Sequence, residues 1–258
     1  MEEVSSIAYG VHQILRQGHY DGIRSFDGFD YVSSVIKSDP FHNYFFVTSN
    51  SPQGLDEDAM IKILRNLRKD NLDAFLYLKA DHVESFTDFI CSHKLVERGV
   101  DSYMVKNLTS TKEVALPNGF VLTTDYDFDQ MANMLVECFD GWQDEKEYAA
   151  VYEKLRHQNV DGFVFETYAI TFDGKVVASG AVALGRKQNL AYYHNTGVDA
   201  RYRRKGLYTA LISARDNFAL QNGVNKVVAI TEPNGDAFKA MGKEGFKEED
   251  RFILYAFP

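Results

Sequence analysis

Cysteine is scarce in this chain, and the scarcity excludes two common ways of holding a protein together. The 258 residues contain two cysteines, Cys91 and Cys138, which form neither a disulfide framework nor the paired spacing of a metal site. We therefore expect no bound metal. A chain without disulfides fits a reducing compartment, and we expect a cytoplasmic location.

Apolar runs long enough to cross a bilayer are also absent. The first residues, Met1-Glu2-Glu3-Val4, are acidic and lack the basic region of a secretory signal. No low-complexity tract interrupts the chain. We expect a globular protein with no membrane partner, and 258 residues suffice for one large domain or two of ordinary size.

Positive charge is in the minority. The chain has 28 Lys and Arg residues against 37 Asp and Glu residues, which gives a formal net charge of −9. Non-specific nucleic-acid binding depends on neutralising phosphates, so we expect no nucleic-acid partner. The acidic surplus favours a cationic acceptor, such as an amine.

Against this background, cations gather in one short stretch, Arg201-Tyr202-Arg203-Arg204-Lys205-Gly206-Leu207-Tyr208. The run before it, Leu190 to Val198, is rich in aromatic and β-branched residues and is typical of a strand. Apolar residues follow it at helical spacing: Leu207, Ala210, Leu211, Ala214 and Phe218. The sequence therefore predicts a strand, a basic glycine turn and a helix that stops at Asn222-Gly223.

Such a turn can capture an anion. The first amides of a helix have no internal partners and carry the positive end of the helix dipole. Gly206 would let a phosphate approach the backbone where a Cβ would block it. The cations from Arg201 to Lys205 add to the local field. The alternative is an ordinary solvated helix start.

A second pattern downstream favours the anion site. Lys226 to Thr231 is typical of a strand, and Asn234 then opens a short helix. The turn Lys243-Glu244-Gly245-Phe246 closes that helix, and a last strand follows from Phe252 to Phe257.

This arrangement resembles the GCN5-related N-acetyltransferase (GNAT) superfamily over roughly Gly119 to Pro258. Arg203-x-x-Gly206 is similar to the pyrophosphate signature of that family, and Asn234-x-x-Ala237 is similar to its late helix. The resemblance implies an α/β chain with a mixed α+β sheet. It also implies acetyl-coenzyme A (or another acyl-coenzyme A) as the co-substrate.

The resemblance assigns a set of cofactor-binding residues. The strand before the turn would bond to the pantetheine arm, the turn and first helical amides would hold the diphosphate, and the late asparagine would reach the thioester end. In this sequence these residues are Thr196, Val198, Arg203, Arg204, Lys205, Gly206, Leu207, Tyr208 and Asn234.

Two positions depart from the family pattern. Tyr208 stands where the family usually has a small residue, which narrows access to the backbone. Met241 stands where many members carry a tyrosine that protonates the leaving thiolate, and a thioether has no proton to give. Tyr208 could replace that acid or could pack against the cofactor, and water could also supply the proton.

Three side chains are candidates for the catalytic work. His194 would sit beside the thioester and has an unperturbed pKa near neutrality, which suits a general base. Its alternative role is packing in the core or at a domain interface. Glu232 is a carboxylate alternative at the end of a central strand, and Tyr208 is the candidate acid.

Three further residues are candidates for acceptor binding: Trp142, Glu166 and Tyr192. Trp142 lies between two predicted helices that typically wall the acceptor site in this family, and an aromatic ring there could take a cation on its face. Each of the three could instead be an anchor or a strand-end residue.

The N-terminal half repeats the order of the C-terminal half. It predicts a strand, a turn, a helix, a strand, a helix and a strand: 43–48, 49–54, 56–71, 73–79, 82–93 and 99–108. We predict two GNAT-like units, each a mixed sheet flanked by helices, at residues 1–112 and 116–258. The first copy lacks the signature, because it has Ser51-Pro52-Gln53-Gly54-Leu55-Asp56 at the equivalent turn and acid would repel a diphosphate.

The sequence therefore predicts an N-acetyltransferase that moves an acetyl or longer acyl group directly from its coenzyme A thioester to a primary amine of a small molecule. One alternative is a non-catalytic protein that binds or senses acyl-coenzyme A. Another is aminoacyl transfer by a tandem GNAT-like protein. We expect a monomer or a homodimer.

Overall fold

The computed structural model of the chain describes residues 6–18, 22–33, 43–70, 72–139 and 162–258. The N-terminal half contains α1 (Ser6–Gly18), β1 (Gly22–Phe26), β2 (Phe29–Ser33), β3 (Tyr44–Val47), α2 (Glu57–Lys69), β4 (Phe75–Lys79), α3 (Thr87–Ser92) and β5 (Val96–Asn107). The C-terminal half contains β6 (Phe120–Thr123), α4 (Phe128–Cys138), β7 (Phe163–Phe172), β8 (Lys175–Gly185), β9 (Leu190–Val198), α6 (Leu207–Gln221), β10 (Lys226–Thr231), α7 (Asp236–Lys243) and β11 (Lys247–Ala256).

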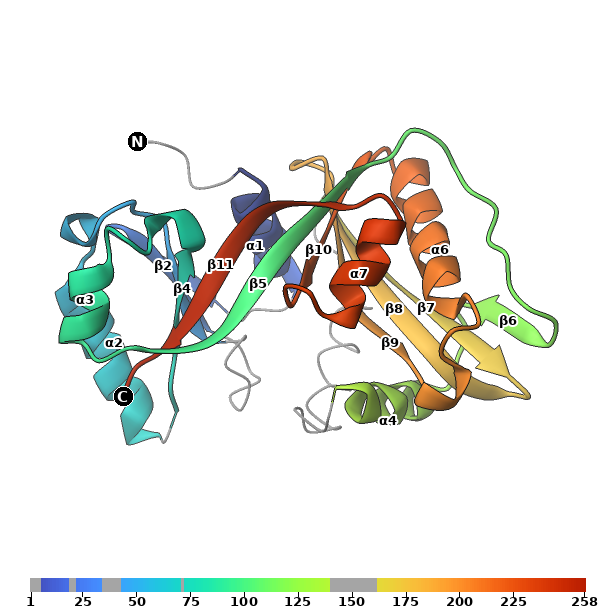
Figure 1. Ribbon diagram of the computed structural model, residues 1–258, viewed down its shortest axis with the longest axis horizontal. Coiled ribbons are helices and arrows are strands. Elements are labelled where there is room, and N and C mark those ends of the chain that lie inside the picture. The colour runs from blue at the N-terminus through green and yellow to red at the C-terminus, as the bar shows by residue number, and fades with distance from the viewer. Residues whose placement is uncertain (1–5, 19–21, 34–42, 71, 140–161) are drawn as a thin grey trace.

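The described strands form one continuous sheet that runs the length of the molecule (Figure 1). Their order is β1-β2-β3-β4-β11-β5-β10-β9-β8-β7-β6. Two neighbouring pairs are parallel, β3 with β4 and β9 with β10, and the other pairs are antiparallel. The predicted fold class, a mixed α+β sheet flanked by helices, is confirmed.

The two halves exchange their last strands at the middle of this sheet. β5 ends the N-terminal half but pairs with β10, and β11 ends the chain but pairs with β4. β5 and β11 also pair with each other along their length. Figure 1 shows these two long strands, green and red, crossing the centre of the molecule. Each half is therefore completed by a strand from the other.

The halves repeat one series of pairings, as a tandem organisation predicts. Strands β1, β2 and β3 are successively antiparallel, and α2 then leads to β4, which is parallel to β3. Strands β7, β8 and β9 repeat this series, with α6 leading to the parallel strand β10. The boundary at residues 112–116 remains a prediction.

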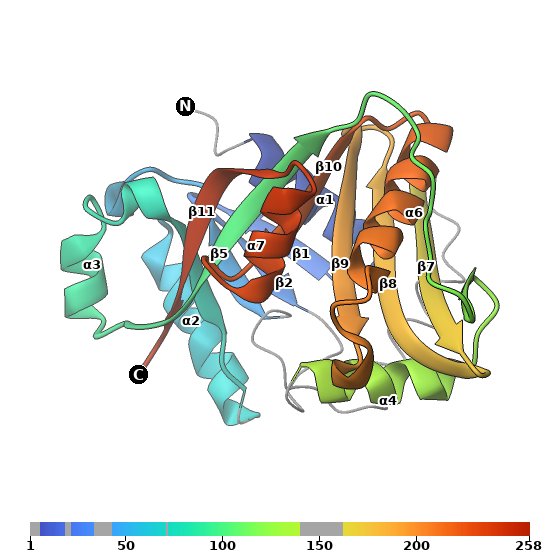
Figure 2. The same ribbon diagram turned by 45° about the vertical axis from the view of Figure 1, so that its right-hand side comes forward.

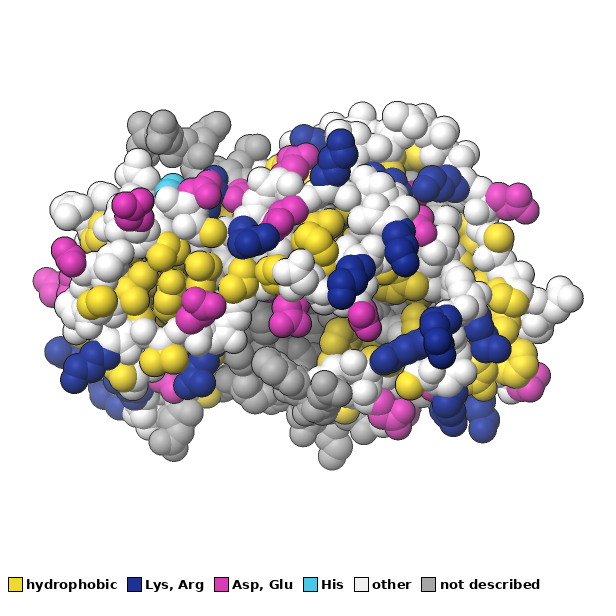
Figure 3. Space-filling model, in the orientation of Figure 1, with side chains coloured by type: hydrophobic (Ala, Val, Ile, Leu, Met, Phe, Trp, Pro, Cys, Tyr) yellow, Lys and Arg dark blue, Asp and Glu magenta, His cyan; other side chains and the backbone are white. Residues whose placement is uncertain are grey.

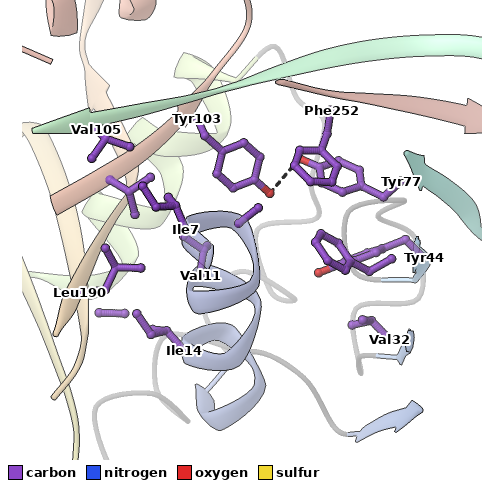
Figure 4. Packing of buried hydrophobic residues seen from close by; sticks show 14 of the residues in the cluster. Ile7, Val11, Ile14, Val32, Tyr44, Tyr77, Tyr103, Val105, Leu190 and Phe252 are labelled. Atoms are coloured by element: carbon purple, nitrogen blue, oxygen red, sulfur yellow. Dashed lines mark hydrogen bonds between the residues drawn. The ribbon is translucent and has the colours of Figure 1, made fainter. Parts of the chain in front are cut away.

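Helices cover both faces of the sheet. On one side, which we call the α1 face, α1 packs its apolar residues on the exchanged strands and on β9 (Figure 4). Helix α4 lies against the same face of β8 and β9. The opposite side, which we call the α6 face, is covered by α2 over Leu76 and Leu78, and by α6 over Val227 and Ala229. Figure 2 shows α6 and α7 in front of the strands and α1 behind them.

Several element bounds differ from the sequence prediction. Strand β1 was not predicted, because Gly22 suggests a break; it forms an edge strand with Arg24 and Ser25 exposed. The helix predicted over 82–93 is a helix only from Thr87 to Ser92, after a short 3₁₀ turn. Strand β11 begins at Lys247, well before the predicted start, because β5 supplies a partner from the other half.

Two general features can be stated for the part of the chain that the structure describes. No helix there is both long and apolar enough to span a membrane. No three side chains of His, Cys, Asp or Glu gather there as metal ligands would.

Candidate active site

The site begins where two parallel strands separate. Strands β9 and β10 pair only from Ala191 to Tyr193, opposite Val227 to Ala229. Beyond that point β9 continues beside β8, and β10 continues beside β5. The facing edges of the diverging strands therefore carry backbone N–H and C=O groups that no ladder between β9 and β10 uses. An extended molecule with amide groups can bond to such an edge as an added strand does.

A β-bulge bends β9 inside this wedge. Ala181 pairs with His194, and Ser179 pairs with Gly197, so one residue of β8 faces two residues of β9. Asn195, one of those two, has a φ of 50°. Asparagine tolerates this left-handed conformation better than most residues do. The bulge turns the backbone of β9 away from a regular strand where the wedge opens.

Arg215 holds this bulge in place from the α6 face of the sheet. The side chain comes from α6 and is fully buried. Its Nη1 donates to Thr196 Oγ1 at 2.8 Å and to the carbonyl of Ala181 at 3.2 Å. Its guanidinium also lies over the Tyr193 ring, 4.5 Å from the ring centre. Helix α6 and strand β9, the two elements predicted to hold the cofactor, are therefore locked together.

The basic turn follows β9, and one of its cations is already paired. Arg201 forms a forked ion pair with Asp199, and both carboxylate oxygens accept from its guanidinium. This pairing lowers the pKa of Asp199 and keeps it ionised. Arg201 therefore contributes less to an anion site than its place in the sequence suggests.

The other three cations of the turn are exposed: Arg203, Arg204 and Lys205. Arg203 Nε donates to the carbonyl of Val198 at 3.1 Å, which ties the turn back to the strand. In Figure 3, Lys and Arg side chains gather at the lower right, around the end of α6 where this turn lies. Gly206 has a φ of 80°, and no atom lies within 4 Å of the position that a Cβ would occupy. The turn thus presents an open backbone surrounded by positive charge.

The two equivalent helices of the halves begin differently. At α6 the N-cap is Gly206, and no side chain caps the first amides. At α2 the carboxylate of Asp56 accepts from the amide of Ala59 at 3.0 Å, and Glu57 and Asp58 follow in the first turn. An anion is therefore favoured at α6 and repelled at α2. The geometry agrees with the prediction that the first copy has lost its anion site.

His194 and Tyr192 are brought together on the α1 face of β9. Their rings stack with a centroid distance of 5.3 Å and an interplanar angle of 8°. The ring of Phe165 from β7 lies 5.6 Å from His194 on its other side. The imidazole is 7% exposed, so it is held in one orientation at the point where the wedge opens.

A carboxylate of the N-terminal half joins this group, and the sequence did not predict it. Thr231 pairs with Ser102, so Glu232 and Asp101 are next to each other where β10 ends. Tyr77 of β4 donates its hydroxyl to Asp101 Oδ2 at 2.6 Å. The Tyr103 hydroxyl in turn donates to that of Tyr77 at 3.3 Å, as Figure 4 shows.

Burial and charge act together on Asp101. Burial, opposed by the hydrogen bond from Tyr77 and helped by the charge of Glu232, raises the pKa of Asp101 from 3.8 to about 6. The Tyr192 phenol also has a raised pKa, because it is buried and because it lies near the charge of Asp101. Asp101, Glu232, Tyr192 and His194 therefore form one cluster on the α1 face.

Two predicted residues lie elsewhere. Glu166 alternates with Phe165 along β7, so it shares the α6 face with Tyr168 rather than the α1 face with His194. Its carboxylate accepts from the amide of Thr167 at 2.9 Å. Tyr208 packs on the α6 face between α6 and α7, and burial raises its pKa. The structure therefore does not bring Glu166 or the Tyr208 phenol together with His194.

The remaining predicted residues have simpler outcomes. Trp142 lies outside the described residues. Asn234 is exposed in the turn between β10 and α7, with a φ of 63°. Met241 is 2% exposed in the apolar cluster beneath α7, so its position in the chain supplies packing rather than a proton.

A buried polar network on the α6 face also escaped the sequence analysis. Asp216 of α6 accepts from the Tyr193 hydroxyl at 2.9 Å and from Lys106 Nζ at 2.5 Å. The signal for it is two adjacent charges, Arg215 and Asp216, inside an otherwise apolar helix face. The partners lie on β5 and β9, and only the fold brings them together.

Taken together, the wedge and the turn suit a long ligand with amides at one end and a diphosphate at the other. Acyl-coenzyme A has this form. The edge of β9 from Asn195 to Val198 would hold the pantetheine amides, and the open amides of α6 with Arg204 and Lys205 would hold the diphosphate. The thioester end would then lie near His194.

Comparisons with known proteins agree with this geometry. Residues 128–246 match the model of the acetyltransferase (GNAT) family. No curated protein sequence matches the chain.

Solved structures of similar fold cover nearly the whole chain. A GCN5-related N-acetyltransferase from Kribbella flavida superposes with a TM-score of 0.69 and 11% identity, over 100% of this chain and 97% of that one. One from Sphaerobacter thermophilus gives 0.66 and 13%, over 97% and 86%. A tandem GNAT protein from the clavulanic acid biosynthesis pathway gives 0.63 and 13%, over 88% and 78%. Identities this low show the fold alone.

The family match covers the strands and helices that form the wedge and the basic turn. Residues 128–246 therefore match the acetyltransferase (GNAT) family, and the unit that precedes them repeats the same series of strand pairings.

Proposed function

We propose that the protein transfers an acetyl or other acyl group from acyl-coenzyme A directly to a primary amine of a small molecule. The observation that carries this proposal is the pairing of an open strand wedge with an uncapped, cation-rich helix start at Gly206. The fold supports acyl transfer in general, and the acceptor is the part that we infer.

The chain's own residues divide the work of binding. Arg204, Lys205 and the first amides of α6 neutralise the diphosphate, and Arg203 shapes the turn through the carbonyl of Val198. Arg215 keeps the β9 edge in place through Thr196. Asn234 lies after β10, where it can reach the far side of the wedge. When bound, acetyl-coenzyme A supplies an activated thioester carbonyl.

Proton handling falls to the cluster on the α1 face. An amine attacks a carbonyl only when it is neutral, so a base must take a proton first. His194 and Glu232 lie at the end of the wedge where the thioester would be. The leaving thiolate takes a proton either from water or from Tyr208, although the packing of that phenol on the α6 face favours water.

Thermal unfolding with coenzyme A, acetyl-coenzyme A and no ligand tests the cofactor site. A ligand at one hundred times its Kd adds about 2.7 kcal/mol to the free energy of unfolding. We expect this stabilisation to be lost in Arg204→Glu and Arg203→Glu and kept in Arg65→Glu, an exposed charge reversal on α2. Release of free thiol with a panel of amines then tests catalysis.

The second candidate is a protein that binds acyl-coenzyme A without turning it over. The burial of Met241, at the position of the usual acid, is the observation that favours it. Stabilisation by acetyl-coenzyme A without thiol release for any amine would select this function. Absence of stabilisation by any acyl-coenzyme A would overturn both.

A further inference from the structure

The N-terminal half contributes strand β5 to the candidate site. β5 pairs with β10 on one side and with β11 on the other, so it lies at the centre of the sheet. Asp101 is opposite Phe252 on β11 and next to Glu232 after β10. A residue of the half without an anion site is thereby placed at the carboxyl end of the strand that bounds the wedge.

Within the part of the chain that the structure describes, no cation is paired with Asp101; the nearby Lys79 is paired with Asp250 and Asp81. Among the described side chains, the Tyr77 hydroxyl donates to Asp101 at 2.6 Å, and the charge that acts on Asp101 is the carboxylate of Glu232. Among the described residues, no cation forms an ion pair with Asp101 or with Glu232. Holding the largely desolvated Asp101 carboxylate beside the exposed Glu232 carboxylate without a counter-ion is costly. Such a pair is the complement of a ligand that brings its own cation.

Aromatic side chains surround Asp101 on neighbouring strands. Tyr192 stacks on His194, and Tyr77 stacks on Phe252 with ring centres 5.0 Å apart. Aromatic faces attract ammonium groups and pack against apolar stems. Glu232 is exposed, whereas Asp101 is only partly exposed. The cluster therefore offers a polar end for a cation and an apolar wall for the group attached to it.

We propose that Asp101 binds the ammonium group of the acceptor together with Glu232 and then removes one of its protons. This inference rests on the proposed acyl transfer and extends it to a residue of the N-terminal half. Asp101 takes a proton from R–NH₃⁺ and leaves R–NH₂. The nitrogen then forms a bond to the acyl carbon, the carbon–sulfur bond breaks, and the second nitrogen proton goes to the departing thiolate. Asp101 releases its proton to water.

The same chemistry selects a class of acceptor. Two carboxylates repel a third, so an amine that carries a carboxylate on the neighbouring carbon should be rejected. We therefore expect decarboxylated amines with an apolar or aromatic stem to be preferred over the corresponding amino acids. Tyramine and tyrosine form a matched pair, since they differ by one carboxylate.

The experiment compares wild type, Asp101→Asn and Asp81→Asn with tyramine and tyrosine at saturating acetyl-coenzyme A. Asparagine keeps the volume of Asp101 and can still accept from Tyr77. Asp81 is a matched control, because it lies near the same end of β4 with its side chain 80% exposed. We expect Asp101→Asn to lower kcat/KM for tyramine by at least about 100-fold. Its affinity for coenzyme A should stay within twofold, and the preference for tyramine over tyrosine should shrink.

A pH profile separates a proton acceptor from a merely structural residue. The groups that face Asp101 are Tyr77 on β4, Tyr103 on its own strand, Glu232 after β10 and Tyr192 on β9. The Lys79–Asp250 ion pair joins β4 and β11 nearby. Because the pKa of Asp101 is about 6, kcat/KM should rise with pH through that value. Tyr77→Phe removes the hydrogen bond that lowers this pKa, so the rise should move to higher pH.

The outcomes distinguish this inference from the proposed function. Calorimetry with tyramine and coenzyme A reports binding even without turnover. If wild type binds tyramine without releasing thiol and Asp101→Asn does not bind it, the site stands and the proposed reaction fails. If Asp101→Asn keeps wild-type turnover and preference, or if wild type does not bind tyramine, the inference is overturned.

Discussion

A largely desolvated carboxylate beside another carboxylate weakens the folded state, and Asp101 is in this position. Folding raises its pKa from 3.8 to about 6, mainly through burial. A group with a raised folded pKa contributes stability that is complete below the unfolded pKa and is lost as the pH rises through the folded pKa. Above pH 6, ionised Asp101 therefore costs roughly 3 kcal/mol.

We predict that Asp101→Asn stabilises the protein at pH 8 relative to wild type and loses this advantage near pH 4. The comparison uses denaturant midpoints at the two pH values, with the exposed Asp81→Asn variant as control. A difference between Asp101→Asn and wild type that is the same at both pH values would contradict the assigned pKa.

His194 could be a general base or a packed core residue, because its burial fits both roles. It is 7% exposed and stacked on Tyr192. We predict that His194→Ala lowers kcat by more than about tenfold and changes affinity for coenzyme A little, because the ring lies at the end of the wedge rather than at the diphosphate turn. Steady-state kinetics and calorimetry measure the two quantities. The exposed Asp81→Asn variant serves as control, and unaltered turnover in His194→Ala would leave His194 a packing role.

Sequence reasoning could single out the residues whose proposed roles depend on near neighbours. Arg203 and Gly206 act through a strand end and a helix start within a few positions, so their spacing is informative. Asp101 and Arg215 could not be found this way. Asp101 lies beside Glu232 because β5 pairs with β10, and Arg215 reaches Thr196 because α6 packs under the bulge of β9. Each role is set by a contact with a residue remote in the chain.

Two turns contain a glycine with positive φ, but replacing the glycine should reduce stability by different amounts at the two positions. Gly28 and Gly206 both have φ near 80°. A Cβ on Gly28 would lie 2.2 Å from the carbonyl oxygen of Gly54, whereas a Cβ on Gly206 would meet no atom within 4 Å. We predict that Gly206→Ala costs about 1 kcal/mol of stability. Gly28→Ala should cost roughly 2–4 kcal/mol, since overpacking adds to the backbone strain.

Denaturant unfolding of the two variants checks this order. The same pair tests the anion site, because only Gly206→Ala changes the turn beside the helix start. Affinity for coenzyme A should fall in Gly206→Ala and stay unchanged in folded Gly28→Ala. The reverse order of stabilities would mean that the turn at Gly28 relaxes.

Elements with a clear apolar periodicity were predictable from the sequence. Elements that depend on the strand exchange between the halves were not. The helix after Gly206 was predicted because its apolar spacing defines it. Strand β11 was predicted too short, because its first residues, such as Lys247 and Glu248, are polar and become strand only beside β5. Pairing with a strand of the other half overrides their local preference.

For the whole molecule, the strand exchange makes two repeated units into one folding unit. If the chain is divided after residue 115, the N-terminal fragment keeps β5 without β10 or β11, and the C-terminal fragment keeps β11 without β4 or β5. Each fragment then exposes unpaired strand edges and apolar residues from the centre of the sheet, including Tyr103 and Phe252. Helix α1 also loses Leu190, against which it packs.

We therefore predict that the intact chain unfolds in one cooperative transition and that neither fragment, 1–115 or 116–258, folds alone. Equal calorimetric and van't Hoff enthalpies would establish the first point. Mixing the fragments should restore both the near-ultraviolet circular dichroism signal and binding of coenzyme A, because the pairings need no covalent link between the halves. A fragment 116–258 that folds and binds coenzyme A alone would contradict this prediction. It would mean that the cofactor site forms without β5, and that β5 and Asp101 contribute only to the acceptor side.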